Sequence, residues 1–235
     1  DPKELLEILE LDMGLLAAAQ KAAQLFPLKV PRRFLELIEK GNPNDPLLLQ
    51  ILPLGLEEKS EPGYFLDPLQ EKKSNPVAGL LQKYHGRVLV TLTSACAVHC
   101  RYCFRRHFPY AENNPGTRGW DKLLNYIEQD VTIKEVILSG GDPLAVSDKL
   151  LELFTQRLSS IPHVTRLRIH TRIPIYLPER ITDELIAWIK SLRFDVVIVI
   201  HANHPREISS FVVAALKRLR AEGVTLLNQS VGIRN

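Results

Sequence analysis

The spacing of hydrophobic and polar positions changes at about residue 80. Before that point, apolar residues recur at helical spacing in two short stretches, residues 5–9 and 33–39. Residues 42–46 form a Pro- and Asn-rich turn, and residues 57–73 mix charge, Gly and Pro without periodicity. We therefore expect residues 1–80 to form a helical segment followed by an irregular linker.

From about residue 83 onward, short β-branched runs alternate with helical patterns. The runs predict five strands, at residues 87–93, 135–138, 166–170, 195–200 and 224–227. Candidate caps mark the helices between them: Ser147 or Asp148, Thr182, and Gly223 as a stop. Repeated βα units require a parallel sheet covered by helices. The sequence thus predicts an α/β fold with a partial (β/α) barrel over residues 81–235.

Composition and charge narrow the class of protein. The 235 residues are 45% hydrophobic, which suffices for one large domain, alone or with a smaller appendage. A net charge of +3 without a dense basic block gives no support to nucleic-acid binding. The longest apolar runs are too short to cross a bilayer, and the first residues form no secretory signal. The chain lacks an initiator Met and stops just after the fifth predicted strand, so we expect it to be a C-terminally incomplete piece.

Polar and reactive residues follow each predicted strand. In barrels of this kind, chemistry sits at the carboxyl ends of the strands. Those ends carry Cys96 and the residues after it, then residues 139–142, 170–172, 201–204 and 228–230. This placement is typical of a barrel enzyme.

The three cysteines fall within eight positions, in the spacing C-x3-C-x2-C. An odd, tightly clustered set is a poor disulfide framework and favours a metal or cluster site in a reducing compartment. Thiolates from Cys96, Cys100 and Cys103 can hold three irons of a [4Fe–4S] cube and leave the fourth iron open. The open iron can bind the amino and carboxylate groups of S-adenosylmethionine. In this respect the motif resembles the radical S-adenosylmethionine superfamily.

Two alternatives remain open for the cysteines. His107 lies four residues after Cys103, so these residues with Cys96 and Cys100 would make a Cys3His zinc site in a non-enzymatic protein. The usual structural zinc pattern pairs two Cys knuckles, and the sequence has only one. Three inert core thiols are the other alternative, but the loop is too polar for a core.

The longer motifs resemble the lysine 2,3-aminomutase family. They are CRYCFRR at Cys100–Arg106, LSGGD at Leu138–Asp142, RIP at Arg172–Pro174, LPERIT at Leu177–Thr182, HANHP at His201–Pro205 and LNQSV at Leu227–Val231. The segment from Cys100 to Tyr110 most resembles the bacterial branch that makes (R)-β-lysine for elongation factor P. The resemblance implies an isomerase that converts L-lysine to β-lysine with a [4Fe–4S] cluster, S-adenosylmethionine and pyridoxal phosphate. It also implies self-association and an external electron donor, and cluster chemistry implies the cytoplasm.

The resemblance assigns roles to individual residues. Lys83, Tyr84 and Arg87 match positions that grip the pyridoxal phosphate group, and Arg105 matches the clamp for the substrate carboxylate. The positions expected to bind S-adenosylmethionine are Tyr102, Ser139, Gly140, Gly141, Asp142, His201 and Gln229.

Structural roles are the alternatives for the same residues. The Lys-Tyr pair at positions 83–84 is also what a solvated strand entrance looks like, and Arg105 is also a surface cation near an anionic cluster. Tyr102 would simply pack beside the cluster, and Asp142 would cap the turn at Pro143. For His201 and Gln229, the alternative is a satisfied polar residue of the core.

Two expected features have no counterpart in these 235 residues. The family's Schiff-base lysine and the acidic residues for the substrate ε-ammonium lie beyond position 235 of the matched pattern. We therefore expect this chain to bind the cluster and S-adenosylmethionine without turnover. Specificity for lysine over glutamate stays open, as does a maturase without pyridoxal phosphate.

Overall fold

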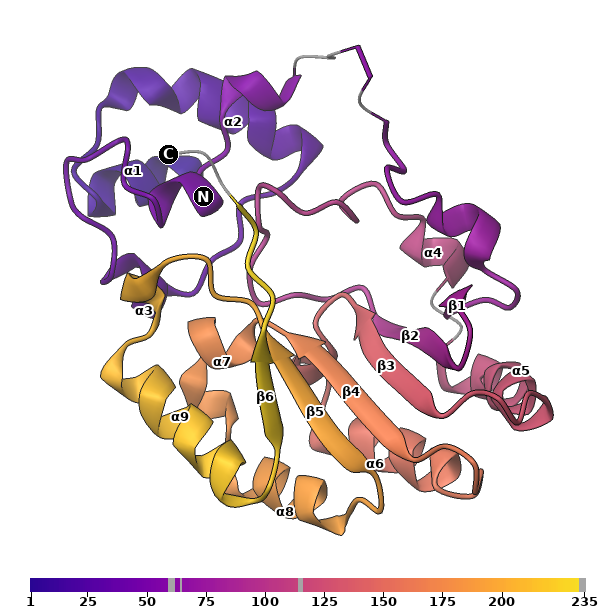
Figure 1. Cartoon of the computed structure of the whole chain (residues 1–235). Helices are drawn as coiled ribbons and strands as arrows, with labels where there is room; N and C mark the ends of the chain where they lie inside the picture. The colour runs from indigo at the N-terminus through magenta and orange to yellow at the C-terminus, as the bar shows by residue number, and fades with distance from the viewer. Residues whose placement is uncertain (59–61, 64, 114–115, 233–235) are drawn as a thin grey trace.

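The computed structural model describes residues 1–58, 62–63, 65–113 and 116–232. In this part of the chain a sheet has six strands in chain order, β1 to β6. The parallel strands are β2 (Arg87–Thr93), β3 (Glu135–Gly140), β4 (Arg166–Thr171), β5 (Asp195–Ile200) and β6 (Thr225–Asn228). The curved, mostly parallel sheet confirms the predicted α/β partial barrel (Figure 1).

One strand was not expected from the sequence. β1 (Leu80–Tyr84) pairs antiparallel with β2 through a tight hairpin in which Gly86 has φ of 76°. Its burial runs from two buried residues to two exposed ones and does not alternate. Without a period of two, the pattern gives no strand signal.

Helices on the outer face of the sheet cover its aliphatic side (Figure 1). They are α5 (Gly116–Gln129), α6 (Asp148–Leu158), α8 (Asp183–Ser191) and α9 (Ser210–Ala221). The strand register aligns Val90, Leu138, Ile169 and Ile198 in one row across four strands, and each is fully buried. Because side chains alternate along a strand, their neighbours Ser139 and His170 face the opposite, concave side.

The predicted helix caps are confirmed. Ser147 accepts a hydrogen bond from the backbone N–H of Leu150, so Ser147 rather than Asp148 caps α6. Thr182 does the same for α8. The chain then leaves α9 through Gly223, whose φ of 79° suits a residue without a Cβ.

The N-terminal segment contains α1 (Pro2–Ile8), α2 (Leu16–Leu25) and α3 (Arg32–Leu35). The prediction of a helix over residues 33–39 is wrong in extent, because the chain continues past Leu35 with i→i+3 hydrogen bonds such as Ile38 N–H to the Leu35 carbonyl. α2 was missed because Ala supplies most of its inward-facing positions. Short elements fill the connections: η1 (Met13–Leu15), η2 (Leu48–Gln50), η3 (Gly55–Glu58), η4 (Glu71–Ser74), α4 (Tyr110–Asn113), η5 (Pro143–Ala145), α7 (Ile173–Tyr176), η6 (Pro178–Arg180) and η7 (Pro205–Glu207).

The N-terminal segment lies over the carboxyl ends of the strands (Figure 1). Its buried residues Leu6, Leu47 and Ile51 belong to the same hydrophobic cluster as Leu138 and Ile198 of the sheet. Among the described residues, no helix is both long and apolar enough to cross a membrane.

Candidate active site

A cavity of about 210 Å³ opens at the carboxyl ends of the parallel strands. It is lined by all the residues that the sequence predicts for the cluster, for S-adenosylmethionine and for the substrate carboxylate: Cys96, Cys100, Tyr102, Cys103, Arg105, Ser139, Gly140, Gly141, Asp142, His201 and Gln229. Two further lining residues, His170 and Arg172, had no predicted role. The topology thus brings five strand ends to one place.

The N-terminal segment holds the cysteine loop in position. The backbone N–H of His99 donates to the Lys29 carbonyl, and its ring stacks on Phe26 at 4.7 Å. The backbone N–H of Arg101 donates to the Gln50 carbonyl at 2.9 Å. A loop between two cysteines is therefore anchored by residues 50 or more positions away.

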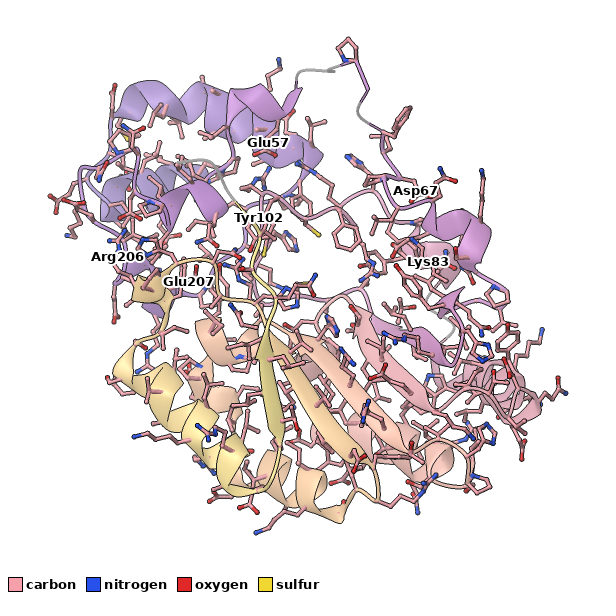
Figure 2. All side chains as sticks on the ribbon, viewed as in Figure 1. Glu57, Asp67, Lys83, Tyr102, Arg206 and Glu207 are labelled. Atoms are coloured by element: carbon pink, nitrogen blue, oxygen red, sulfur yellow. The ribbon has the colours of Figure 1, made fainter. Side chains whose placement is uncertain are left out.

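A largely buried carboxylate strengthens this anchor. Glu57, which Figure 2 shows beside the loop, pairs with the guanidinium of Arg101, and Arg106 reaches the same carboxylate at 2.8 Å. Burial alone would raise the pKa of Glu57, but hydrogen bonds from Arg101, the Leu54 backbone and Arg106 lower it overall. Glu57 therefore stays ionised and binds the loop at neutral pH.

The three thiols are half-buried and free. Burial, with the nearby charge of Asp142, raises the pKa of Cys96 to about 12, and burial also raises the pKa of Cys103. A metal must therefore displace protons to bind here. Among the described residues, no three His, Cys, Asp or Glu side chains converge closely enough to hold a single metal ion.

Gly141, the residue directly after β3, packs against the start of the cysteine loop. A Cβ on Gly141 would lie 2.5 Å from the Ala95 carbonyl oxygen and 2.8 Å from that of Thr93. The backbone N–H groups of Gly141 and Asp142 donate to these two carbonyls. The sequence predicted close approach to a ligand, whereas here the close approach is to the start of the cysteine loop.

Asp142 is buried and fully bonded. Its Oδ1 accepts from the Thr171 hydroxyl and the Leu144 N–H, and its Oδ2 accepts from the N–H groups of Arg172 and Ile173. Burial raises the pKa of this carboxyl, although the four hydrogen bonds lower it. Of the two predicted alternatives, this geometry favours capping the turn after β3.

Arg172 is the hub of the network behind the cavity. Its Nη1 donates to Sγ of Cys100 at 2.9 Å and to the Tyr102 hydroxyl. Its Nη2 reaches Glu207 Oε2 at 3.2 Å, and its Nε donates to the His201 carbonyl. No individual role was predicted for Arg172, although it follows a predicted strand and begins the RIP motif at Arg172–Pro174.

Tyr102, which Figure 2 shows between the N-terminal segment and the sheet, belongs to the same network. Its hydroxyl accepts from Arg172 and from Asn203 Nδ2 at 2.6 Å. Burial raises the pKa of the phenol, which is neutral at neutral pH. These contacts favour packing beside the cysteines over the predicted adenosyl contact, although the side chain still lines the cavity.

Two histidines lie next to each other in the wall of the cavity. The rings of His170 and His201 meet edge to face at 5.8 Å. Burial lowers the pKa of both to about 4, helped by Arg168 for His170 and by the partner ring for His201. Both are therefore neutral donors and acceptors at neutral pH.

Arg105 already holds a carboxylate. Its Nε and Nη2 bind the two oxygens of Glu71 at 2.9 and 2.7 Å, and its Nη1 donates to the Ser139 hydroxyl at 3.0 Å. The guanidinium and the carboxylate are both buried. The fork is thus shaped for bidentate carboxylate binding, with an internal partner in place.

The three residues predicted for pyridoxal phosphate lie elsewhere. Tyr84 and Arg87 face each other across the β1–β2 hairpin, and the side chain of Lys83 lies on the β1 side of the molecule, away from Tyr102 (Figure 2). They lie at the amino end of β2, about 20 Å of strand from its carboxyl end. None of them lines the cavity.

Comparison with known proteins identifies the family. Residues 90–235 match the model of the radical SAM superfamily, where SAM denotes S-adenosylmethionine. The chain is 48% identical to an L-lysine 2,3-aminomutase of Haemophilus influenzae, covering 98% of this chain and 68% of the relative. It is 47% identical to one of Escherichia coli, covering 100% and 69%, and 40% identical to one of Clostridium subterminale, covering 86% and 48%. The chain belongs to the radical SAM lysine 2,3-aminomutase family.

Membership confirms the predicted enzyme class, an isomerase, and implies a [4Fe–4S] cluster and S-adenosylmethionine. The cavity contains the part of the chain on which the resemblance to this family rests, because the cysteine loop lines it. The family model begins at Val90, the fourth residue of β2, and covers all the other parallel strands.

Proposed function

We propose that Cys96, Cys100 and Cys103 hold the [4Fe–4S] cluster. Three thiols on one loop line one cavity, and thiolate is the usual ligand of such clusters. Arg172 donates to one of these sulfurs, and the charges of Arg105 and Arg106 act on Cys103. Cationic donors of this kind suit a thiolate-bound cluster, so the residues present fit the group. Bound there, the cluster supplies one-electron chemistry toward S-adenosylmethionine.

We propose that S-adenosylmethionine occupies the cavity beside the cysteines. His201, Gln229 and the turn at Ser139 line it from β3, β5 and β6. Neutral imidazoles at His170 and His201 offer hydrogen bonds without adding charge near the sulfonium. Asp142 contributes indirectly, because it ties the ends of β3 and β4 together.

Arg105 is our candidate for the substrate carboxylate. Its fork binds Glu71 in the same bidentate manner that an amino-acid carboxylate would use. The substrate carboxylate must therefore replace Glu71, and binding includes the release of this internal pair. Ser139 is positioned to keep a hydrogen bond to Arg105 during the exchange.

For pyridoxal phosphate we propose a phosphate grip at Tyr84 and Arg87, with Lys83 nearby. Arg87 and Arg168 share the single carboxylate of Glu135, so this group of three side chains keeps a net positive charge. A dianionic phosphate suits such a surplus.

The resulting proposal is that the chain acts on L-lysine and forms β-lysine, with the (R) product serving the modification of elongation factor P. The observation that carries it is the convergence of eleven predicted residues on one cavity in a chain of this family. We further propose the cytoplasm as its compartment, since the cluster requires reducing conditions. Self-association and an external electron donor stay predictions.

The test uses this chain and the longest reading frame that contains it. Each is reconstituted anaerobically with iron and sulfide, reduced, and given S-adenosylmethionine, pyridoxal phosphate and L-lysine. Chiral mass spectrometry then measures β-lysine and 5′-deoxyadenosine. We expect about four irons per chain and 5′-deoxyadenosine from both proteins, with (R)-β-lysine only from the longer one if it supplies a Schiff-base lysine.

The other outcomes separate the alternatives. Formation of 5′-deoxyadenosine without β-lysine would keep the radical chemistry and move the substrate to glutamate or another amino acid. A colourless protein with bound zinc after anaerobic purification would overturn the cluster assignment. Full turnover by this chain alone would contradict the expectation that its 235 residues lack a required lysine.

A further inference from the structure

Arg172 is a buried cation aimed at one of the cysteines. It lies just beyond the carboxyl end of β4, and its side chain is 7% exposed. Its guanidinium carbon lies 5.4 Å from the ring centre of Tyr102 and 4.6 Å from that of Tyr176. Two aromatic faces thus fix the plane of the guanidinium, and Nη1 lies 2.9 Å from Sγ of Cys100.

The opposite edge of the guanidinium is held by Glu207 and Gln50. Glu207 is fully buried, and its Oε2 lies 3.2 Å from Nη2 of Arg172. Gln50 accepts from the same nitrogen and donates from Nε2 to Glu207 at 2.7 Å. These two residues come from the segment before α9 and from the N-terminal segment. Together with Tyr102 of the cysteine loop, they position Arg172 from three separate parts of the chain.

The network contains one buried pair of opposite charges, Arg172 and Glu207. Arg172 and Glu207 neutralise each other in the interior, which a buried pair requires. Because Glu207 also accepts from the N–H groups of Asn203 and His204, it is committed to its own side of the guanidinium. The N–H groups on Nη1 are then left to Cys100 and Tyr102.

We propose that Arg172 is a positioning residue for the iron–sulfur cluster, which donates a hydrogen bond to the Cys100 thiolate and raises the reduction potential of the cluster. The inference rests on the proposed function, because it requires the cluster to be bound by Cys100. An N–H group donated to a ligand sulfur withdraws negative charge from it. The reduced cluster carries one more negative charge than the oxidised cluster, so this hydrogen bond stabilises the reduced form more.

The experiment compares two charge-balanced double variants of the reconstituted chain. Arg172→Gln with Glu207→Gln removes the donor without leaving a buried charge unpaired. Arg168→Gln with Glu135→Gln removes another Arg–Glu pair that also involves β4, and neither of these residues lines the cavity. Arg172→Lys keeps the charge but loses the planar fork. Iron and sulfide per chain, far-UV circular dichroism and the midpoint potential from an EPR-monitored redox titration are measured for each.

We expect the Arg172 double variant to keep its fold and to have a midpoint potential more negative than both the unsubstituted chain and the control, with Arg172→Lys in between. Loss of iron from this variant alone, with the fold intact, also supports the positioning role. A full iron content with a potential equal to that of the control would overturn the inference. If the unsubstituted chain binds no cluster, the proposed function fails first, and that result is independent of the variants.

Discussion

At the scale of single residues, Gly141 offers the sharpest stability test. An added Cβ would meet three backbone atoms of residues 93–95 at 2.5–2.8 Å, and backbone cannot rotate away as a side chain can. We predict that Gly141→Ala lowers the free energy of unfolding by about 3 kcal/mol, measured by urea denaturation. Gly232→Ala, where nothing lies within 4 Å, is the control and should change it by less than about 0.5 kcal/mol. Equal stability of the two variants would refute the close approach.

His170 and His201 make stability depend on pH. Their pKa values are about 4 in the folded chain against an ordinary 6.5, so the unfolded chain binds more protons between these values. The contribution of these two residues to the free energy of unfolding is therefore fully present above pH 6.5, and it is lost as the pH drops toward 4. Each His contributes at most about 1.4 kcal/mol per pH unit.

The measurement for this prediction is urea unfolding of the metal-free chain at several pH values between 4.5 and 7.5. His170→Gln with His201→Gln should flatten the pH dependence in this window. His163→Gln, whose ring nitrogen lies 3.0 Å from the Ile127 carbonyl outside the cavity, is the matched control. An unchanged slope in the double variant would show that the two rings are not held neutral by burial.

The sequence located most cavity residues but not their partners. Cys96 can be recognised from the cysteine spacing, and Gly141 from its position after a predicted strand. Arg172 and Glu207 do not, because a single charged residue in sequence gives no sign that it will be buried against another one 35 positions away. Likewise, the pairing of Arg105 with Glu71 depends on the path of a segment that has no periodicity.

At the scale of elements, the cysteine loop depends on the N-terminal segment. The pair between Arg101 and Glu57 joins the loop to η3, and both side chains are largely buried. Removal of one partner from a buried pair leaves an uncompensated charge, which costs about 3 kcal/mol. We predict this loss for Arg101→Met and for Glu57→Gln, with the double variant losing less than the sum.

Hydrogen exchange measured by mass spectrometry tests the same pair locally. The N–H groups of His99 and Arg101 donate to the N-terminal segment, so peptides spanning residues 96–103 should exchange faster in both single variants. Arg157→Met is the control, because its pair with Asp121 between α6 and α5 is exposed and worth less than about 1 kcal/mol. Unchanged exchange in the loop would mean that the pair does not order it.

The elements also show where sequence patterns succeed. β2 and β5 match their predicted bounds, since β-branched runs flanked by turns give a clear signal. β1 and α2 were missed because their stability comes from tertiary contacts: β1 from pairing with β2, and α2 from close packing of Ala19 and Ala22. Local pattern carries little information about either contact.

At the scale of the whole molecule, the sequence pattern changes at about residue 80, but the residues on both sides of this position share one hydrophobic core. Residues of α1 and η2 belong to the same hydrophobic cluster as the strands. The segment also contributes Gln50 and Glu57 to the surroundings of the cysteines. The periodicity of apolar residues differs between the two regions, whereas packing depends on which apolar faces meet.

The shared core predicts that the two regions unfold together. Ile51, in the N-terminal segment, is fully buried, and Ile51→Ala should cost about 3 kcal/mol through lost burial and a residual cavity. The two tryptophans of the chain, Trp120 and Trp188, lie in α5 and α8 on the far side of the sheet. If unfolding is one cooperative transition, the substitution shifts the urea midpoint of tryptophan fluorescence as much as that of far-UV circular dichroism. Leu25→Ala, at an exposed position of α2, should leave both midpoints in place. If Ile51→Ala shifts the midpoint of circular dichroism but not that of tryptophan fluorescence, the two regions unfold separately.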